Sequence, residues 1–191
     1  EQWVGGASGA MIGYNADLAE IRRANAASTQ YDVAFYGDSI TYGMRALMGT
    51  AWVNSVFTPF FGGLRVGFFG VPANVTSDLV WRLTSGNERL TPDPKVIVLW
   101  IGTNDLGLHA ESPAQKIEWL LGWLKTHTTS RIVFLGMLPA ARYDTSRANI
   151  EVAAACARHG ATFANCGRGM NPMDPTLFGL SLIHISEPTR R

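Results

Sequence analysis

The sequence predicts a single α/β domain, in which a parallel sheet of five strands is covered by helices on both faces. Five short apolar runs recur about every 30 residues, and each has the length of a strand. They are apolar throughout rather than at every second position, which is typical of strands buried on both faces. The segments between them have helical patterning, and alternating strands and helices favour a parallel sheet. The 191 residues fit one domain.

The elements follow one another in a regular order. Residues 1–12 are rich in glycine and serine and small neighbours, which predicts a loose lead-in, and residues 15–27 follow as a surface helix with Leu18 and Ile21 at helical spacing. The expected strands are residues 33–36, 64–69, 95–101, 131–138 and 161–165. The expected helices between them are residues 43–57, 75–83, 113–126 and 145–158.

Composition excludes several classes of protein. Hydrophobic residues make up 47% and charged residues 16% of the chain, which is enough apolar material for a core and too little charge for a disordered chain. The net charge of +1 is spread along the sequence, so neither nucleic acid nor an anionic membrane is an expected partner. No apolar run reaches the roughly 18 residues that would predict a transmembrane segment.

The two cysteines predict neither a metal site nor a redox site. Cys156 and Cys166 have no CxxC spacing and no histidine at metal-ligand distance. We therefore expect them to pack, and the sequence implies no metal and no organic cofactor.

Polar residues follow the first three expected strands, at the edge where ligands bind in sheets of this kind. Ser39, in Gly37-Asp38-Ser39, stands where a strand turns into a helix, so backbone N–H groups and the helix dipole point at an anion formed on the serine. A glycine-containing loop, residues 70–74, follows the second strand, and Asn104 follows the third. This set predicts a serine nucleophile with an oxyanion hole. On the hexapeptide at residues 36–41 alone, helix capping by Asp38 and Ser39 is an equally good interpretation.

These blocks resemble the GDSL/SGNH hydrolase superfamily, whose first block is Gly-Asp-Ser and whose third is Gly-x-Asn-Asp. Trp81-Arg82-Leu83 and residues 94–104 and 135–139 are similar to the catalytic subunits of intracellular platelet-activating-factor acetylhydrolases, and the similarity spans residues 12–178. The resemblance implies a three-layer α/β/α, flavodoxin-like fold over residues 13–179, with its C-terminal end truncated. It also implies hydrolysis of a carboxylic ester with a short acyl group, such as an acetyl ester of a lipid or a sugar.

The resemblance assigns roles to individual residues. Ser39 is the expected nucleophile, and the backbone N–H groups of Ser39 and Ala73 and the side chain of Asn104 are the expected oxyanion donors. Ala73 stands where the family has a glycine; it keeps its N–H, but a positive φ there would strain it. Gly70 is expected to shape the loop. The expected substrate-binding residues are Asp38, Gly70 and Asp105. Trp52, Phe57, Phe60 and Phe61 are candidates for an acyl pocket, although such residues more often belong to a core or an interface.

The catalytic base is the incomplete part of this assignment. The family supplies it from an Asp-x-x-His near the C-terminus. His109 is expected in an exposed loop, and His127 and His159 at helix ends that face away from Ser39. His184 remains, but Ser181 stands where the aspartate should be.

We expect the missing Asp-x-x-His to result from foreign nucleotide sequence at the end of the coding region. Residues 180–190 are those encoded by a transposase adapter used in sequencing libraries, so we expect residues 180–191 to be adapter read-through. The natural gene is then expected to continue with Asp-x-x-His after residue 179, and His184 is an imperfect stand-in. Reading the locus without adapter sequence tests this, and a stop codon or unrelated sequence there would contradict it.

Two alternatives to an esterase stay open. One is a non-catalytic domain on the same scaffold that binds a carbohydrate, a lipid or a protein partner, which the missing Asp-x-x-His favours. A flavin-binding flavodoxin is less well supported, since the first loop lacks the hydroxyl and glycine residues that wrap a phosphate. The expected partner is a small-molecule ester, and a homo- or heterodimer is open. The resemblance favours the cytoplasm, while secretion stays open because the chain does not begin with methionine.

Overall fold

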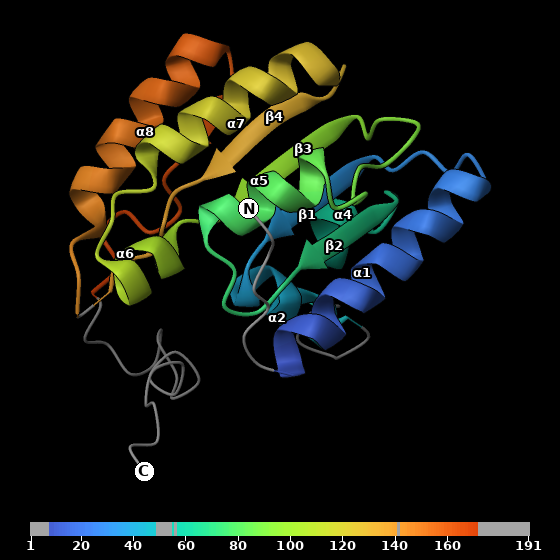
Figure 1. The fold of residues 1–191 in the computed structure, drawn as a ribbon, viewed down its shortest axis with the longest axis horizontal. Helices are drawn as coiled ribbons and strands as arrows, with labels where there is room; N and C mark the ends of the chain where they lie inside the picture. Colours follow the sequence, from blue (N-terminus) through green and yellow to red (C-terminus); the bar gives the residue numbers. More distant parts are fainter. Residues whose placement is uncertain (1–7, 49–54, 56, 141, 172–191) are drawn as a thin grey trace.

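The computed structural model of the chain describes residues 8–48, 55, 57–140 and 142–171. Within these residues, one parallel sheet has the strand order β2-β1-β3-β4-β5 (Figure 1). Its strands are β1 (Val33–Gly37), β2 (Val66–Gly70), β3 (Val96–Trp100), β4 (Arg131–Leu135) and β5 (Thr162–Ala164). The predicted five-stranded parallel sheet is confirmed, and its strand order is that of a flavodoxin-like fold.

Helices cover both faces of this sheet. They are α1 (Ser8–Ala26), α2 (Ser39–Leu47), α4 (Thr58–Phe61), α5 (Thr76–Thr84), α6 (Thr103–His109), α7 (Ala114–His127) and α8 (Thr145–His159). The larger core joins apolar side chains of α1, α5, α7 and α8 to one face of the sheet. The smaller core joins α2 and α4 to side chains of the opposite face, such as Phe35, Phe68 and Val98. None of the helices in the described part of the chain is long and apolar enough to cross a membrane.

Several helices differ from the sequence prediction. Helix α1 already begins at Ser8, so the loose lead-in predicted for residues 1–12 is wrong over residues 8–12, while residues 1–7 lie outside the described residues. Helix α2 begins at Ser39 itself rather than at residue 43, and it ends at Leu47 rather than at residue 57. Helix α6 was expected to be a loop, and its seven residues are too few to show a clear helical period in the sequence.

The register of the three central strands positions the candidate site. Gly37, the last residue of β1, is level with Gly70 at the end of β2 and with Trp100 at the end of β3. The chain therefore leaves all three strands at the same height, on the same edge of the sheet. A β-carbon on Gly37 would overlap the Trp100 carbonyl, and one on Gly70 would overlap the Tyr42 backbone nitrogen of α2. Glycine at both positions lets α2 begin directly against the strand ends.

Candidate active site

Ser39 is the first residue of α2 and lies at the carboxyl end of β1. The preceding Asp38 is the N-cap, because the backbone N–H of Ile40 donates to Asp38 Oδ1 over 2.9 Å. Ser39 is half-buried, and its hydroxyl makes no hydrogen bond with any residue that the structure describes. The capping interpretation therefore holds for Asp38 but leaves Ser39 without a structural task.

The loop after β2 brings Ala73 to the same edge. The Val71 N–H donates to the Gly37 carbonyl over 3.1 Å, which ties this loop to the end of β1. Ala73 has a φ of +63° and is exposed, and its N–H donates to no acceptor within the described residues. Ala73 thus adopts the positive-φ conformation that suits glycine and strains alanine.

Asn104 comes from the loop after β3 and is the second residue of α6. Its side chain is only 6% exposed, and its Nδ2 donates to the Asn74 carbonyl over 2.9 Å. A carboxamide nitrogen carries two hydrogens, so one donor remains for another acceptor. Asn104 is therefore joined directly to the loop that contains Ala73.

Asn74 is a residue of this region to which the sequence interpretation gave no role. It is buried, its carbonyl accepts from Asn104, and its side-chain Oδ1 accepts from Arg82 over 3.1 Å. The only sequence signal was its place between Ala73 and the start of α5. Both partners lie elsewhere in the chain, 8 and 30 residues away.

The carboxylates of Asp38 and Asp105 are buried and accept hydrogen bonds from other parts of the protein. Both are 1% exposed. Asp105 Oδ2 accepts from the Thr76 N–H over 2.8 Å and from the Thr76 hydroxyl over 2.9 Å, at the start of α5. Asp38 caps α2, and burial raises the pKa of its carboxyl to about 7, with the Asp105 charge adding to the shift.

The expectation that Asp38, Gly70 and Asp105 bind substrate stays a prediction, and the contacts that the structure gives them are internal. Gly70 lies buried against the backbone of α2, and the two carboxylates bind backbone and side-chain groups of the protein. All three hold the loops and helices in place around Ser39.

The matching family model is described as "GDSL-like Lipase/Acylhydrolase family" and covers residues 35–188. The chain belongs to this family. The predicted resemblance to this family is thereby confirmed.

Similar proteins include acetylhydrolases. The human platelet-activating factor acetylhydrolase IB subunit alpha2 is 34% identical over 109 residues, which cover 56% of this chain and 44% of that protein. The bovine subunit alpha1 is 29% identical over 155 residues, which cover 76% of this chain and 63% of that protein. The chain thus spans less than two thirds of the length of these relatives.

Solved structures of low sequence identity share the fold. AlinE4, an SGNH-hydrolase family esterase, superimposes with a TM-score of 0.57 at 19% identity, covering 81% of this chain and 90% of that one. Axe2, an acetylxylan esterase from Geobacillus stearothermophilus, gives a TM-score of 0.55 at 18% identity, covering 71% and 75%. Both are consistent with a three-layer α/β/α fold.

The histidines of this family member lie as follows. His184 is outside the described residues. His109 is exposed and ends α6 rather than lying in a loop. His127 ends α7 and stacks on Trp123 with ring centroids 4.3 Å apart, and the Nε2 of His159, at the end of α8, lies 3.8 Å from Glu118. The last two precede β4 and β5, so they lie at the opposite edge of the sheet from Ser39, as expected.

The aromatic candidates for an acyl pocket belong mostly to the core. Phe57 and Phe61 stack with centroids 4.4 Å apart and pack on the sheet against Phe35 and Phe68. Phe60 is 77% exposed, and Trp52 lies outside the described residues. For Phe57 and Phe61, the core interpretation is thus the one observed.

The cysteines behave differently from each other. Cys156 is buried in the core, which raises the pKa of its thiol to about 11. Cys166 is exposed, so the expectation that both pack is wrong for Cys166.

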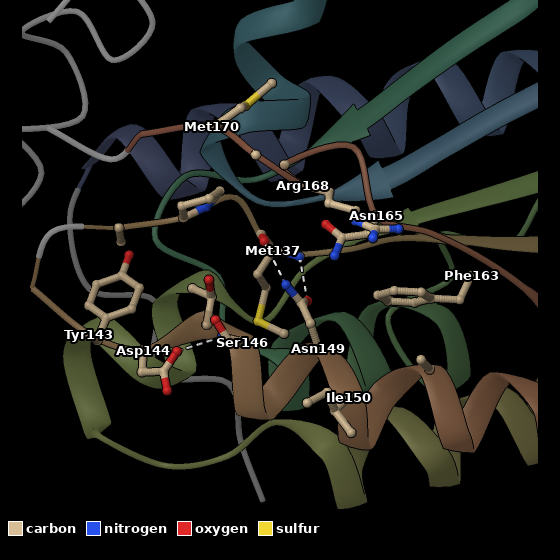
Figure 2. A pocket seen from close by; sticks show the side chains of 16 residues that line it. Met137, Tyr143, Asp144, Ser146, Asn149, Ile150, Phe163, Asn165, Arg168 and Met170 are labelled. Carbon is tan, nitrogen blue, oxygen red and sulfur yellow. Dashed lines mark hydrogen bonds between the residues drawn. The ribbon is translucent and has the colours of Figure 1, made fainter. Parts of the chain in front are cut away.

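A pocket of about 620 Å³ lies at the carboxyl ends of β4 and β5 (Figure 2). Side chains from the β4–α8 connection, from α8, from β5 and from the segment after β5 line it, among them Met137, Tyr143, Asn149, Phe163 and Met170. The Asn149 amide accepts from the Met137 N–H and donates to the Met137 carbonyl, both over 2.9 Å, and so closes one wall. No sequence motif pointed to this pocket, because its walls come from elements that are separate in the chain.

Tyr143 links this pocket to the candidate site. Its ring lies against Gly107 of α6, where an added β-carbon would be 3.1 Å away. The pKa of Tyr143 is raised first by burial and then by the negative charge of Asp38. The pocket and the Ser39 region are therefore neighbours along one edge of the sheet.

Proposed function

We propose that this chain is a serine ester hydrolase that cleaves short-acyl carboxylic esters through an acyl-Ser39 intermediate. The observation that carries the proposal is the meeting of three groups at one sheet edge. These are the Ser39 hydroxyl at the start of α2, the N–H of Ala73 and the amide of Asn104, and among the described residues neither the hydroxyl nor the Ala73 N–H has a hydrogen-bond partner. The family to which the chain belongs supports the same reaction class.

In the proposed reaction Ser39 Oγ attacks the ester carbonyl carbon while His184 takes the hydroxyl proton. The carbonyl oxygen becomes an oxyanion, which accepts from the Ser39 and Ala73 N–H groups and from Asn104 Nδ2. In the best-studied protease, one such donor contributes about 2.7 to 4 kcal/mol. The tetrahedral intermediate collapses, the alkoxide leaves with the proton from His184, and water then hydrolyses the acyl-serine by the same steps.

His184 is the weak member of the proposed set. Ser181 occupies the position three residues earlier, where the family has an aspartate. That aspartate orients the imidazole and stabilises its protonated form, and its loss in a protease example lowered kcat about 10⁴-fold. We therefore expect slow turnover by the chain in its given sequence, and further loss of rate on His184→Ala.

We propose short acyl groups because the names of two similar proteins refer to acetyl groups. One is a platelet-activating factor acetylhydrolase and another an acetylxylan esterase. A series of p-nitrophenyl esters from acetate to dodecanoate tests the chain length. A falling kcat/KM with each added pair of carbons supports the proposal, and a preference for the longest ester contradicts it.

Hydrolysis of p-nitrophenyl acetate by the Ser39→Ala variant tests the nucleophile. We expect the rate above background to fall by about 10²-fold, since removing a whole triad costs about 2 × 10⁶-fold and the missing aspartate already accounts for about 10⁴-fold. The matched control is Ser85→Ala, which removes an exposed serine hydroxyl at the C-terminal end of α5. Equal rates in Ser39→Ala and the unsubstituted chain would remove Ser39 as the nucleophile.

A second candidate is a non-catalytic domain that binds an acylated carbohydrate or lipid. The observation in its favour is Ser181 in place of the aspartate. Calorimetric titration with an acetylated oligosaccharide, beside a turnover assay supplemented with imidazole as an external base, separates the two. Saturable binding without turnover in either buffer favours the binding domain.

A further inference from the structure

Arg82 is a buried cation that reaches from α5 to the candidate active site. Arg82 is 1% exposed and is among the largest fully buried side chains of the structure. Its guanidinium donates to the Gly37 carbonyl over 3.0 Å, to the Phe69 carbonyl over 3.1 Å and to Asn74 Oδ1 over 3.1 Å. One side chain therefore binds the ends of β1 and β2 and the loop that follows β2.

Each acceptor lies next to a group of the proposed oxyanion hole. Gly37 lies two residues before Ser39, and Asn74 directly follows Ala73. The Asn74 carbonyl, in turn, accepts from Asn104 Nδ2. Asn74 is thus held at its side chain by Arg82 and at its carbonyl by Asn104, and Arg82 also binds the Gly37 carbonyl, two residues before Ser39.

The charge of Arg82 is balanced on the side away from the site. Its Nε donates to Glu88 Oε2 over 2.8 Å, and its Nη2 lies 3.3 Å from Asp17 Oδ2. Both carboxylates are fully buried. A buried ion pair is a weak explanation of stability, because the loss of hydration offsets the attraction between the charges. The fixed geometry of the guanidinium fork is the better explanation for a cation at this position.

We propose that Arg82 is a positioning residue for ester hydrolysis, which fixes the Ala73–Asn74 turn relative to Ser39 through Asn74 and the Gly37 carbonyl. The inference rests on the function proposed above. Donors to an oxyanion act only within a narrow distance range, and a displacement of about 1 Å can lower the rate about 10²-fold. Lysine keeps the charge but has three donors on one atom, so it cannot reach these acceptors together.

The first test measures kcat and KM for p-nitrophenyl acetate in Arg82→Lys, in Asn74→Ala and in the double variant. We expect each single change to lower kcat about 10- to 10²-fold, with KM within about twofold, because the loss is in transition-state stabilisation. The double variant should lose little more than the worse single variant, since both changes break the same link. Rates are taken per folded molecule, with the folded fraction measured by thermal unfolding.

Arg45→Lys is the matched control. Arg45 binds the same Asp17, over 2.5 Å, and also Glu20, but none of its described hydrogen bonds goes to the ends of β1 and β2 or to Asn74. We expect it to lower the melting temperature and leave kcat unchanged. A normal kcat in Arg82→Lys with only a lower melting temperature would overturn the proposal, as would losses that multiply in the double variant.

A second measurement does not depend on turnover. The amide resonances of Ala73 and of the Asn104 side chain should shift in Arg82→Lys and in Asn74→Ala, and stay unchanged in Arg45→Lys. Unmoved resonances in the first two variants would overturn the proposal. The Ser39→Ala variant distinguishes failure of the proposed function from failure of the proposed role of Arg82. Full turnover by Ser39→Ala contradicts the proposed function. Loss of turnover in Ser39→Ala, together with a normal kcat in Arg82→Lys, contradicts only the role of Arg82.

Discussion

Ala73 has a left-handed backbone conformation, with a φ of +63°. For an L-residue this conformation costs about 1 to 2 kcal/mol, because the β-carbon crowds the following carbonyl. The strain lies at the N–H that we propose as an oxyanion donor. Strained residues of this kind persist where the surrounding contacts hold them in place, and here Asn104 and Arg82 both hold the next residue.

Replacing Ala73 by glycine should relieve this strain. We expect Ala73→Gly to raise the free energy of unfolding by up to about 1 kcal/mol, because the relief exceeds the extra entropy of glycine in the unfolded chain. Urea unfolding measures the change. Since the N–H stays, kcat for p-nitrophenyl acetate should be retained.

Ala110 offers a matched control for that change. It has a φ of +52° and is exposed at the C-terminal end of α6, so Ala110→Gly relieves the same kind of strain away from Ala73. A gain in Ala110→Gly combined with a loss in Ala73→Gly would show that the alanine methyl group is needed in the loop.

At the residue scale, the sequence located Ser39 and Asn104 correctly at strand ends because both follow recognisable apolar runs. It did not predict that Asp38 and Asp105 are buried, since the burial of a carboxylate depends on which elements pack over it. Asn74 and Arg82 were not predicted as a pair, because their contacts join segments that are far apart in the chain.

At the scale of elements, side-chain caps decide where helices begin. Asp144 precedes α8, and its Oδ1 accepts from the Ser146 N–H over 2.8 Å (Figure 2). We expect Asp144→Ala to lower the free energy of unfolding by about 1 kcal/mol, as for other N-caps. Asp144→Asn, which keeps the acceptor, should cost much less, and equal losses in both variants would contradict the capping role.

The strands should differ in their resistance to local opening. β1 is buried along its whole length and pairs with β2 and β3, whereas β5 has three residues at the edge of the described sheet and pairs with β4. We expect backbone amides in β5 to exchange with deuterium at least about 10²-fold faster than those in β1. Equal protection in the two strands would show that the sheet opens as a single unit.

Most elements were predictable because their apolar patterns are long. The five strands and the helices α5, α7 and α8 lie within a few residues of the predicted ranges. Helix α6 was missed because its seven residues do not span two full turns of an apolar stripe. The first turn of α1 was missed because its small residues favour a loop as much as a helix.

At the scale of the whole molecule, buried carboxylates make stability depend on pH. Burial raises the pKa of Asp17 to about 8, more than the charges of Arg82 and Arg45 lower it, and raises that of Asp38 to about 7. Burial also raises the pKa of Glu88, whose Oε1 has no hydrogen-bond partner within the described residues. The hydrogen-bonded cluster joins three carboxyl groups, of Asp17, Glu20 and Glu88, to the guanidiniums of Arg45 and Arg82.

These shifts predict that the protein loses stability as the pH rises. Each folded-state pKa lies above its ordinary value, so the folded state holds protons that the unfolded state has released. The free energy of unfolding should therefore fall between about pH 4 and about pH 8, by up to about 1.4 kcal/mol per pH unit for each such proton. Urea unfolding at several pH values measures this slope.

Asp38→Asn tests the contribution of one group to that slope. Asparagine still caps α2 but does not titrate, so the fall in stability up to about pH 7 should become shallower. A stability that rises with pH over this range in the unsubstituted protein would contradict the raised pKa values.

The sheet as a whole was predictable, and its internal connections were not. Apolar runs alternating with helical segments predicted five parallel strands, and the rule for such sheets placed the site at their carboxyl ends. Only three-dimensional packing shows that Arg82 passes beneath the site, because nothing in the local sequence around it names its acceptors.

The raised pKa of Asp17 also affects heat measurements. Near neutral pH, unfolding releases a proton from this carboxyl, and the buffer takes it up. The enthalpy of unfolding measured by calorimetry therefore includes the heat of protonating the buffer. Scans in phosphate and in Tris should give different unfolding enthalpies at the same pH. This difference, divided by the difference between the protonation enthalpies of the two buffers, gives the number of protons released on unfolding.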